Sequence, residues 1–357
     1  MKYHHTRKVL LSIFLFLILL ACQIPIAAGL PFAPPISTPT ASQTFTPTAT
    51  LTASQTPTLT ATLTATQTAT ATLTETPTAT QTPAPSIHRV VIVSIDGLRP
   101  DAILLAPMPN LISLMQSGAF SLGARTVFPS ITLVAHVSML TGMCPSKHGV
   151  DWNDYLPERG YAQGVDLFDI AHAAGLRTEM YVGKKKLKQI TEPSSLDNFV
   201  VIDSDSALMD RLIADFPQDF GVLFVHLPDT DTAGHAYGWL SPEQLSSLQH
   251  TDEVLGRLLA ELDARNLRSE TLIIVTADHG GNGQGHGSDS RENMTIPWIA
   301  SGPGIQPKTL TTLVHTMDTA ATAAFALGLE IPYEWDGVPV YEAFGLPVAK
   351  PSVECQY

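Results

Sequence analysis

The sequence predicts an α/β fold in which a mostly parallel central sheet is sandwiched by helices. Two observations support this fold class. From residue 87 onward, runs rich in Val and Ile alternate with segments of helical spacing, which is the order that builds parallel βαβ units. Several of these runs are apolar throughout, as expected for strands that are covered on both faces.

The expected elements follow in chain order. A β-branched run predicts a strand over 89–95, and helical spacing with a glycine stop predicts a helix over 109–118. The same two patterns predict later strands and helices. The strands are expected at 178–182, 222–227, 271–277 and 296–300, and the helices at 132–140, 166–174, 206–215, 242–265 and 317–327.

The amino terminus has the pattern of an export signal. Lys2, Arg7 and Lys8 precede an apolar run over 9–21, which is short for a membrane-spanning helix. The run ends at Cys22 and resembles a bacterial lipoprotein signal, in which that cysteine carries the lipid. We therefore expect a signal peptide over 1–22 and a lipid anchor on the outer face of the cell membrane or in the periplasm. A plain signal peptide, or an uncleaved anchor, is the alternative.

Residues 23–86 are expected to form a disordered Thr/Pro-rich stalk. Threonine occupies every even position from Thr56 to Thr82, and Glu75 is the only charged residue between 37 and 86. Such a segment has too few bulky apolar side chains to offset the conformational entropy lost on folding. The stalk would hold a folded domain, expected over 87–357, away from a membrane surface.

Charge and cysteine content restrict the function. The formal net charge of −13 argues against binding to a nucleic-acid backbone, and an acidic protein that handles anionic substrates needs local cations. Metal ions can supply them. Cys144 and Cys355 are the only cysteines of the expected domain, so one long-range disulfide is possible, although the fold is not disulfide-scaffolded.

Three predicted strands end in acidic residues or in Asp/His clusters. Asp96 follows the first strand, Asp231 and His235 follow strand 222–227, and Asp278 and His279 follow strand 271–277. A parallel sheet brings such ends to one edge, where carboxylates stay ionised only if cations compensate them. The spacing of Asp231 and His235 lets a turn direct both at one ion. The sequence therefore predicts a metal site at this edge.

Thr132 is the predicted nucleophile. It stands at the expected start of a helix, where free backbone N–H groups and the positive end of the helix dipole favour a bound anion. Metal coordination would lower the pKa of its hydroxyl. The alternative is that Thr132 is only an N-cap residue.

The motifs together resemble the alkaline phosphatase superfamily, and within it the type I phosphodiesterase/nucleotide pyrophosphatase family. They are VIVSIDGLRPD, FPSITLVAHVSMLTG, PSKHGVDWN, PDTDTAGHAYG and VTADHGG, in family order. The resemblance implies an alkaline phosphatase-like core. It also implies two divalent metal ions, usually Zn²⁺ and about 4 Å apart, at the attacking and leaving oxygens of an in-line phosphoryl transfer.

The resemblance also implies roles for individual residues. Asn153 would hydrogen-bond a phosphoryl oxygen, together with a backbone N–H near Thr132. The ligands of one metal would be Asp96, Thr132, Asp278 and His279, and those of the other would include Asp231 and His235.

The second metal needs one more ligand, and here the sequence departs from the larger nucleotide pyrophosphatases. Their late histidine has no counterpart after His315. We expect His286, in GQGHGS, to complete the site, with His315 as the alternative. Among the other candidates, His226 is expected to be a core histidine, and the lysine run 184–188 a solvated surface or a cation cluster that meets an anionic substrate.

The predicted function is hydrolysis of a small phosphate ester, of the phosphodiester or nucleotide pyrophosphate type, through a phosphothreonine intermediate. One alternative is a phosphomonoester or phosphonate hydrolase, or a head-group phosphotransferase, on the same two-metal core. Another is a surface binding protein that has lost catalysis, which would show a missing ligand. Sulfatases are disfavoured because Thr132 occupies the position of their modified cysteine.

Overall fold

The computed structural model describes residues 87–348 and 350–356. The predicted signal peptide with Cys22 and the predicted stalk lie outside the described residues. Among the residues that are described, no helix is both long enough and apolar enough to cross a membrane.

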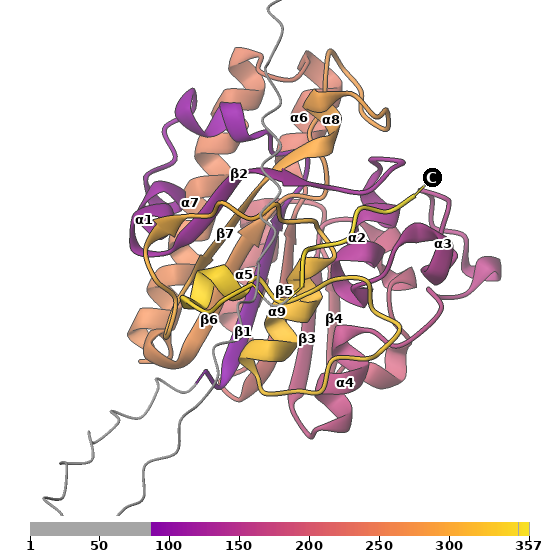
Figure 1. Cartoon of the computed structure of the whole chain (residues 1–357). Coiled ribbons are helices and arrows are strands. Elements are labelled where there is room, and N and C mark those ends of the chain that lie inside the picture. Colours follow the sequence, from indigo (N-terminus) through magenta and orange to yellow (C-terminus); the bar gives the residue numbers. More distant parts are fainter. Residues whose placement is uncertain (1–86, 349, 357) are drawn as a thin grey trace, which may run out of the picture. The chain divides into compact units, whose positions relative to one another are not determined.

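The described residues form an eight-stranded sheet in the order β4-β3-β5-β1-β6-β7-β2-β8 (Figure 1). Five neighbouring strands, from β4 to β6, run parallel, and β7 runs antiparallel to both of its neighbours. The strands are β1 (Arg89–Ile95), β2 (Ala119–Arg125), β3 (Arg177–Val182), β4 (Asn198–Val201), β5 (Phe220–Leu227), β6 (Thr271–Thr276), β7 (Thr295–Ser301) and β8 (Lys308–Thr309).

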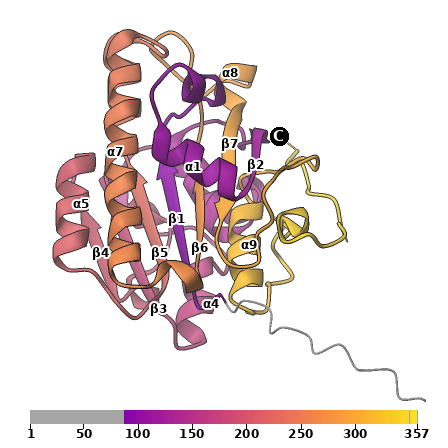
Figure 2. The ribbon, with the colours of Figure 1, turned by 90° about the vertical axis from the view of Figure 1, so that its left-hand side faces the viewer.

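Helices cover both faces of the sheet, with α1, α5 and α7 on one face and α2, α4 and α9 on the other (Figures 1 and 2). The central strands β5 and β6 are buried along their whole length, as a sheet covered on both faces requires. The helices are α1 (Pro109–Ser117), α2 (Thr132–Thr141), α3 (Pro145–His148), α4 (Leu167–Ala173), α5 (Asp205–Ala214), α6 (Asp229–Tyr237), α7 (Pro242–Ala264), α8 (Arg291–Met294) and α9 (Asp318–Ala326).

The predicted fold class is confirmed, and each predicted strand and helix has a counterpart. The prediction omitted β2, β4 and the two-residue strand β8. β2 alternates between buried and partly exposed residues and contains Gly123, and β4 has only four residues, none of them buried. Neither strand therefore carries the continuous apolar pattern that marks the central strands.

One local expectation is corrected, and one question that the sequence left open is answered. Asp231 and His235 do not lie on a turn, because the segment after β5 is the nine-residue helix α6. Its polar composition and internal Gly234 hide the helical pattern. The two cysteines are joined, Cys144 to Cys355, with 5.6 Å between their Cα atoms. This disulfide ties the carboxyl-terminal segment to the connection between α2 and α3.

Candidate active site

Four parallel strands end at one edge of the sheet, and the predicted site residues follow them. In the strand register, Ser94 of β1 pairs with both His226 of β5 and Thr276 of β6, and Val182 of β3 also pairs with His226. The residues that follow these strands are Asp96 after β1, Lys184 after β3, helix α6 after β5, and Asp278 with His279 after β6.

Asp96, Asp278 and His279 form a group that we call the buried cluster, since all three side chains are fully buried. Asp96 Oδ1 lies 3.5 Å from His279 Nε2, and Asp278 Oδ2 lies 3.2 Å from the same nitrogen. The hydroxyl of Thr132 is 3.4 Å from it. The structure thus brings together the four residues expected to bind one metal.

The protonation of His279 is set by its second ring nitrogen. Nδ1 lies 2.8 Å from the carbonyl oxygen of Gly280, which can only accept, so Nδ1 carries the proton. Burial and the neighbouring His286 lower the pKa of His279 well below its usual value, and the ring is neutral. The lone pair of Nε2 therefore faces the two carboxylates.

The two buried carboxylates differ in their surroundings. Burial alone would raise the pKa of Asp96, but the Lys184 ammonium and the hydrogen bond from His226 hold it well below its usual range. Burial, reinforced by the charge of Asp96, raises the pKa of Asp278 well above its usual value. Asp278 therefore needs a further cation, or a proton, at neutral pH.

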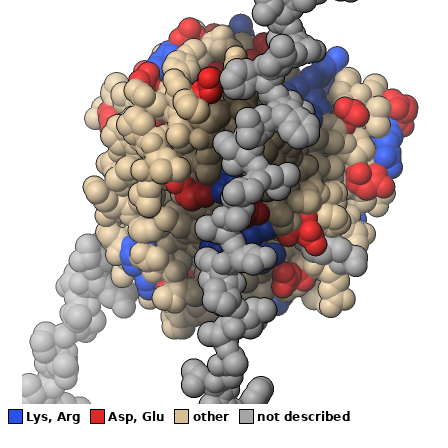
Figure 3. All heavy atoms as spheres, turned by 90° about the horizontal axis from the view of Figure 1, so that it is seen from above, with Lys and Arg blue, Asp and Glu red and all other residues tan. Residues whose placement is uncertain are grey.

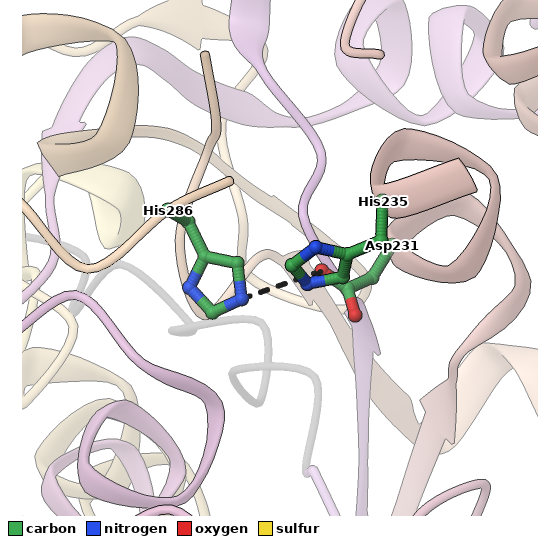
Figure 4. A group of neighbouring side chains, drawn as sticks. All are labelled: Asp231, His235 and His286. Atoms are coloured by element: carbon green, nitrogen blue, oxygen red, sulfur yellow. Dashed lines mark ion pairs between the residues drawn. The ribbon is translucent and has the colours of Figure 1, made fainter. Parts of the chain in front are cut away.

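Asp231, His235 and His286 form a second group, which we call the rim cluster (Figure 4). Asp231 Oδ1 lies 3.5 Å from His235 Nε2 and 3.7 Å from His286 Nε2. Helix α6 supplies Asp231 and His235 one turn apart, and the loop after β6 supplies His286. The His235 side chain is 46% exposed, so this cluster is open to solvent.

The histidines of the rim cluster have the same tautomer as His279. His235 Nδ1 donates to the carbonyl of Gln284 at 2.9 Å, and His286 Nδ1 donates to that of Ser130, also at 2.9 Å. Both Nε2 lone pairs are directed at Asp231. The clusters adjoin, because the rings of His279 and His286 stack with centroids 3.7 Å apart.

Each cluster contains buried oxygen atoms that accept no hydrogen bond from the residues that the structure describes. They are Asp96 Oδ1, Asp278 Oδ2 and Asp231 Oδ1, the same atoms that face the histidine lone pairs. Carboxylate oxygens and imidazole lone pairs that converge without a proton between them repel one another unless a cation lies among them. Nitrogen and oxygen donors of this kind fit divalent ions such as zinc.

Thr132 is the first residue of α2, and Ile131 occupies the N-cap position without a side-chain cap. The alternative role of Thr132 as an N-cap residue is therefore wrong. Asn153 instead accepts a hydrogen bond from Leu133 N at 2.9 Å through its Oδ1. The amide NH₂ of Asn153 is left to donate to another group. Since that bond uses Leu133 N–H, the backbone donor left near Thr132 is its own N–H, which as the first residue of α2 has no partner within the helix.

Lys184 is part of the site, although the sequence favoured a solvated surface over a cation cluster for the lysine run 184–188. Its Nζ lies 2.6 Å from Asp96 Oδ2 and 2.5 Å from Asp231 Oδ2. Burial alone would lower the pKa of Lys184, but these two carboxylates raise it above its usual value. The sequence feature that could have identified Lys184 is its position, because it follows β3 after a single glycine, much as Asp96 directly follows β1. Lys185 and Lys188 are exposed, as the surface interpretation expected.

His226 is buried, as predicted, but it also positions the side chain of Asp96. Its Nδ1 accepts a hydrogen bond from Gly183 N at 3.1 Å, so its Nε2 carries the proton and donates to Asp96 Oδ2 at 2.9 Å. Histidines and carboxylates around a metal ligand commonly fix its orientation in this way. The sequence shows only a histidine in a strand, and its partner depends on how β1 and β5 pair.

Trp239 supports the loops that carry both clusters. Its Nε1 donates to the carbonyl oxygen of Gly97 at 2.9 Å. A Cβ atom on Gly281 would lie 2.1 Å from Trp239 Cε2, and one on Gly234 would lie 2.9 Å from the same ring. The glycines after Asp96, within α6 and after His279 therefore let three segments approach one indole.

His315, the alternative to His286, lies elsewhere. Its Nδ1 is 2.7 Å from Ser352 Oγ, in the carboxyl-terminal segment, and its backbone pairs with Arg125 of β2. The rim cluster contains His286 and not His315. The seven predicted metal ligands thus lie in two adjacent groups.

Comparison with known proteins agrees with this geometry. Residues 90–287 match the sequence profile of the type I phosphodiesterase / nucleotide pyrophosphatase family. A pyrophosphatase/phosphodiesterase of Schizosaccharomyces pombe, itself described as uncharacterized, is 28% identical over 217 residues. That match covers 54% of this chain and 44% of the relative, so the chain spans less than half of that protein.

Solved structures share the fold. Murine ectonucleotide pyrophosphatase/phosphodiesterase 5, an inactive variant in complex with AMP, superposes with a TM-score of 0.62 at 16% identity, over 72% of this chain and 99% of that one. A phosphonate monoester hydrolase from Silicibacter pomeroyi superposes with a TM-score of 0.60 at 16% identity, over 73% of this chain and 77% of that one. The alkaline phosphatase-like core is therefore present here.

Proposed function

Because the chain belongs to the type I phosphodiesterase/nucleotide pyrophosphatase family, we propose that it is a metal-dependent hydrolase of small phosphodiesters or nucleotide pyrophosphates. One observation carries the proposal. Three histidines, His235, His279 and His286, each donate Nδ1–H to a backbone carbonyl and turn the Nε2 lone pair toward an unpartnered carboxylate oxygen. Metal-binding histidines are oriented in this way.

The two clusters would hold two divalent ions, which we propose to be zinc. Bound there, these ions would lower the pKa of the Thr132 hydroxyl and compensate negative charge on the attacking and leaving oxygens. One ion would take Asp96, Thr132, Asp278 and His279 as ligands, and the other Asp231, His235 and His286.

Thr132 would act as the nucleophile. Its Oγ1 forms a bond to phosphorus while the bond from phosphorus to the leaving oxygen breaks on the opposite side. The Asn153 amide and the backbone N–H of Thr132 would donate to a non-bridging oxygen, which gains charge during the transfer. Water then attacks the phosphothreonine, the bond from phosphorus to Oγ1 breaks, and Thr132 is restored.

The test is turnover by the full chain, loaded with zinc, on a panel of chromogenic monoesters and diesters and on nucleotide pyrophosphates. We expect release of product from at least one diester or pyrophosphate, and its loss on prolonged treatment with a chelator. Turnover that survives complete removal of the metal would overturn the proposal.

The same residues bear on the two alternative functions, a binding protein without catalysis and a hydrolase of phosphomonoesters or phosphonates. A binding protein that has lost catalysis would be expected to lack a ligand, whereas all seven predicted ligands lie together. Action on phosphomonoesters or phosphonates uses the same core, and Lys184 is the feature that favours it.

We also propose that the enzyme is exported and anchored by a lipid at Cys22, through a stalk over 23–86. The Cys144–Cys355 disulfide supports this proposal, because structural disulfides are typical of exported proteins. Labelling with radioactive palmitate tests it. We expect label in the wild type and none in the Cys22→Ala variant, and equal labelling of both proteins would contradict the anchor.

A further inference from the structure

Lys184 links the two clusters and also reaches the nucleophile. Its Nζ lies 2.6 Å from Asp96 Oδ2 and 2.5 Å from Asp231 Oδ2, and 3.5 Å from Thr132 Oγ1. The side chain is 19% exposed, so it is not fully enclosed by the protein. A group bonded to Thr132 Oγ1 would stand within reach of this ammonium.

Lys184 and the metal ions would use different atoms of the same carboxylates. The lysine contacts Oδ2 of Asp96 and Oδ2 of Asp231, whereas the unpartnered atoms that face the histidines are the two Oδ1 atoms. The ammonium therefore need not leave when the clusters are filled. It would remain as a third cation beside the nucleophile.

The backbone fixes this position. Gly183 N donates to His226 Nδ1 at 3.1 Å, and a Cβ atom on Gly183 would lie 2.2 Å from Pro228 Cγ. The exit of β3 is thus packed against the start of α6. Lys185, the next residue, points elsewhere, with its ammonium 4.5 Å from the centre of the Tyr155 ring.

Lys184 adds a positive charge that the ligands of the two clusters do not cancel. The two clusters contain three carboxylates and three histidines, so two divalent ions would exceed the carboxylates by one positive charge. The ionised oxygen of Thr132 would cancel that excess. Lys184 then leaves a positive charge for the substrate. The face drawn in Figure 3 carries both acidic and basic side chains.

We propose that Lys184 contacts a non-bridging oxygen of the transferring phosphoryl group and makes the enzyme discriminate by charge. This inference rests on the proposed function. The transferring group of a phosphodiester carries one negative charge, whereas that of a phosphomonoester carries two near neutral pH. The additional cation favours the dianion, so phosphomonoesters are a substrate class of this site alongside diesters.

The test compares two substrates with the same leaving group, p-nitrophenyl phosphate and methyl p-nitrophenyl phosphate, on the full chain loaded with zinc. The Lys184→Met variant removes the charge and keeps the length of the side chain, and Lys184→Arg keeps the charge. Lys188→Met is the control, since Lys188 is exposed on the same segment. Zinc content is measured for every variant.

We expect Lys184→Met to lower kcat/KM for the monoester about tenfold more than for the diester, as for the loss of one charged hydrogen bond. Lys184→Arg should keep the wild-type ratio of the two rates, and Lys188→Met should match the wild type. Equal losses on both substrates would show that Lys184 only orients Asp96 and Asp231. Loss of zinc from Lys184→Met would overturn the inference in the same way, and Lys184→Gln replaces that variant if it does not fold.

Measuring the binding of anions tests the role of Lys184 independently of catalysis. If the wild type turns over no diester or pyrophosphate of the panel above, the proposed function fails. Titration calorimetry with inorganic phosphate and dimethyl phosphate then decides about Lys184. Weaker binding of phosphate alone by Lys184→Met supports the phosphoryl contact. Unchanged binding of both anions rules it out.

Discussion

The buried cluster and the rim cluster use the same chemistry in different surroundings. In both, a histidine donates Nδ1–H to a carbonyl and turns Nε2 toward an unpartnered carboxylate oxygen. The buried cluster is fully enclosed at the ends of β1 and β6, whereas His235 of the rim cluster is 46% exposed on α6. We therefore expect the buried cluster to fix the nucleophile and the rim cluster to exchange its metal with solvent.

The largest effect is expected at Thr132, which adjoins the buried cluster. Thr132→Ala removes the proposed nucleophile and should lower kcat about 10³-fold or more on a chromogenic diester, while Thr132→Ser should keep part of the activity. Stopped assays with mass spectrometry should detect phosphothreonine in the wild type. Full activity of Thr132→Ala would refute the mechanism.

Asp278→Asn should have the next largest effect. It removes the negative charge of a fully buried carboxylate, and solvent cannot replace that charge there. Its Oδ1 can still accept hydrogen bonds from Gly97 N and His279 N, so the loop is expected to keep its fold. The variant should lose one zinc ion per chain and nearly all activity, even with excess zinc in the assay. Restoration by added zinc would mean that the buried cluster is no more enclosed than the rim cluster.

His235→Ala should have a smaller effect that zinc can reverse. The rim cluster keeps two ligands and is open to solvent, so activity should fall at low free zinc and recover as zinc is raised. His172→Ala is a matched control, because the His172 side chain is also 46% exposed and lies in neither cluster. If the two variants depend on zinc alike, the rim cluster is not a metal site.

A change in the packing around Trp239, which contacts the loops of both clusters, should affect the two clusters together. Gly281→Ala places a Cβ atom 2.1 Å from the Trp239 ring, and overpacking of this kind costs about 1–3 kcal/mol. Gly285→Ala is the control, since no atom lies within 4 Å of a Cβ atom there. Thermal melting with and without zinc should give a lower melting temperature for Gly281→Ala than for Gly285→Ala. Equal melting temperatures of the two variants would mean that Trp239 does not constrain the loop.

The smallest effect is expected at Asp166, a buried carboxylate outside both clusters. Burial, with a contribution from Asp169, raises the pKa of Asp166 to about 7. The unfolded chain ionises at the ordinary pKa of 3.8, so the fold loses stability as pH rises from about 4 to about 7, where the buried carboxyl itself ionises. Asp166→Asn keeps an N-cap acceptor for Phe168 N and removes the ionisation.

Urea unfolding measures this difference. We expect the stability of Asp166→Asn relative to the wild type to rise by about 1 kcal/mol or more between pH 4 and pH 8. Sensitivity to chelators should be unchanged, since Asp166 lies in neither cluster. A difference that stays the same from pH 4 to pH 8 would assign the effect to packing and not to charge.

The two clusters also differ in how far the sequence predicts them. Asp96, Asp278 and His279 follow apolar strands, so the parallel sheet alone brings them to one edge. His286 reaches the rim cluster through a glycine-rich loop, which periodicity does not describe, so His315 remained open. Lys184, His226 and Trp239 depend on the approach of segments far apart in the chain, and no local pattern marks their partners.

Anomalous diffraction at the zinc edge, from crystals of the full chain grown with zinc, shows directly whether the two clusters bind metal ions. We expect two peaks, one among Thr132, Asp96, Asp278 and His279, and one among Asp231, His235 and His286. The second peak should weaken first when the crystals are soaked in a chelator. A single peak, or peaks that lie outside both clusters, would show that the two clusters are not a two-metal site.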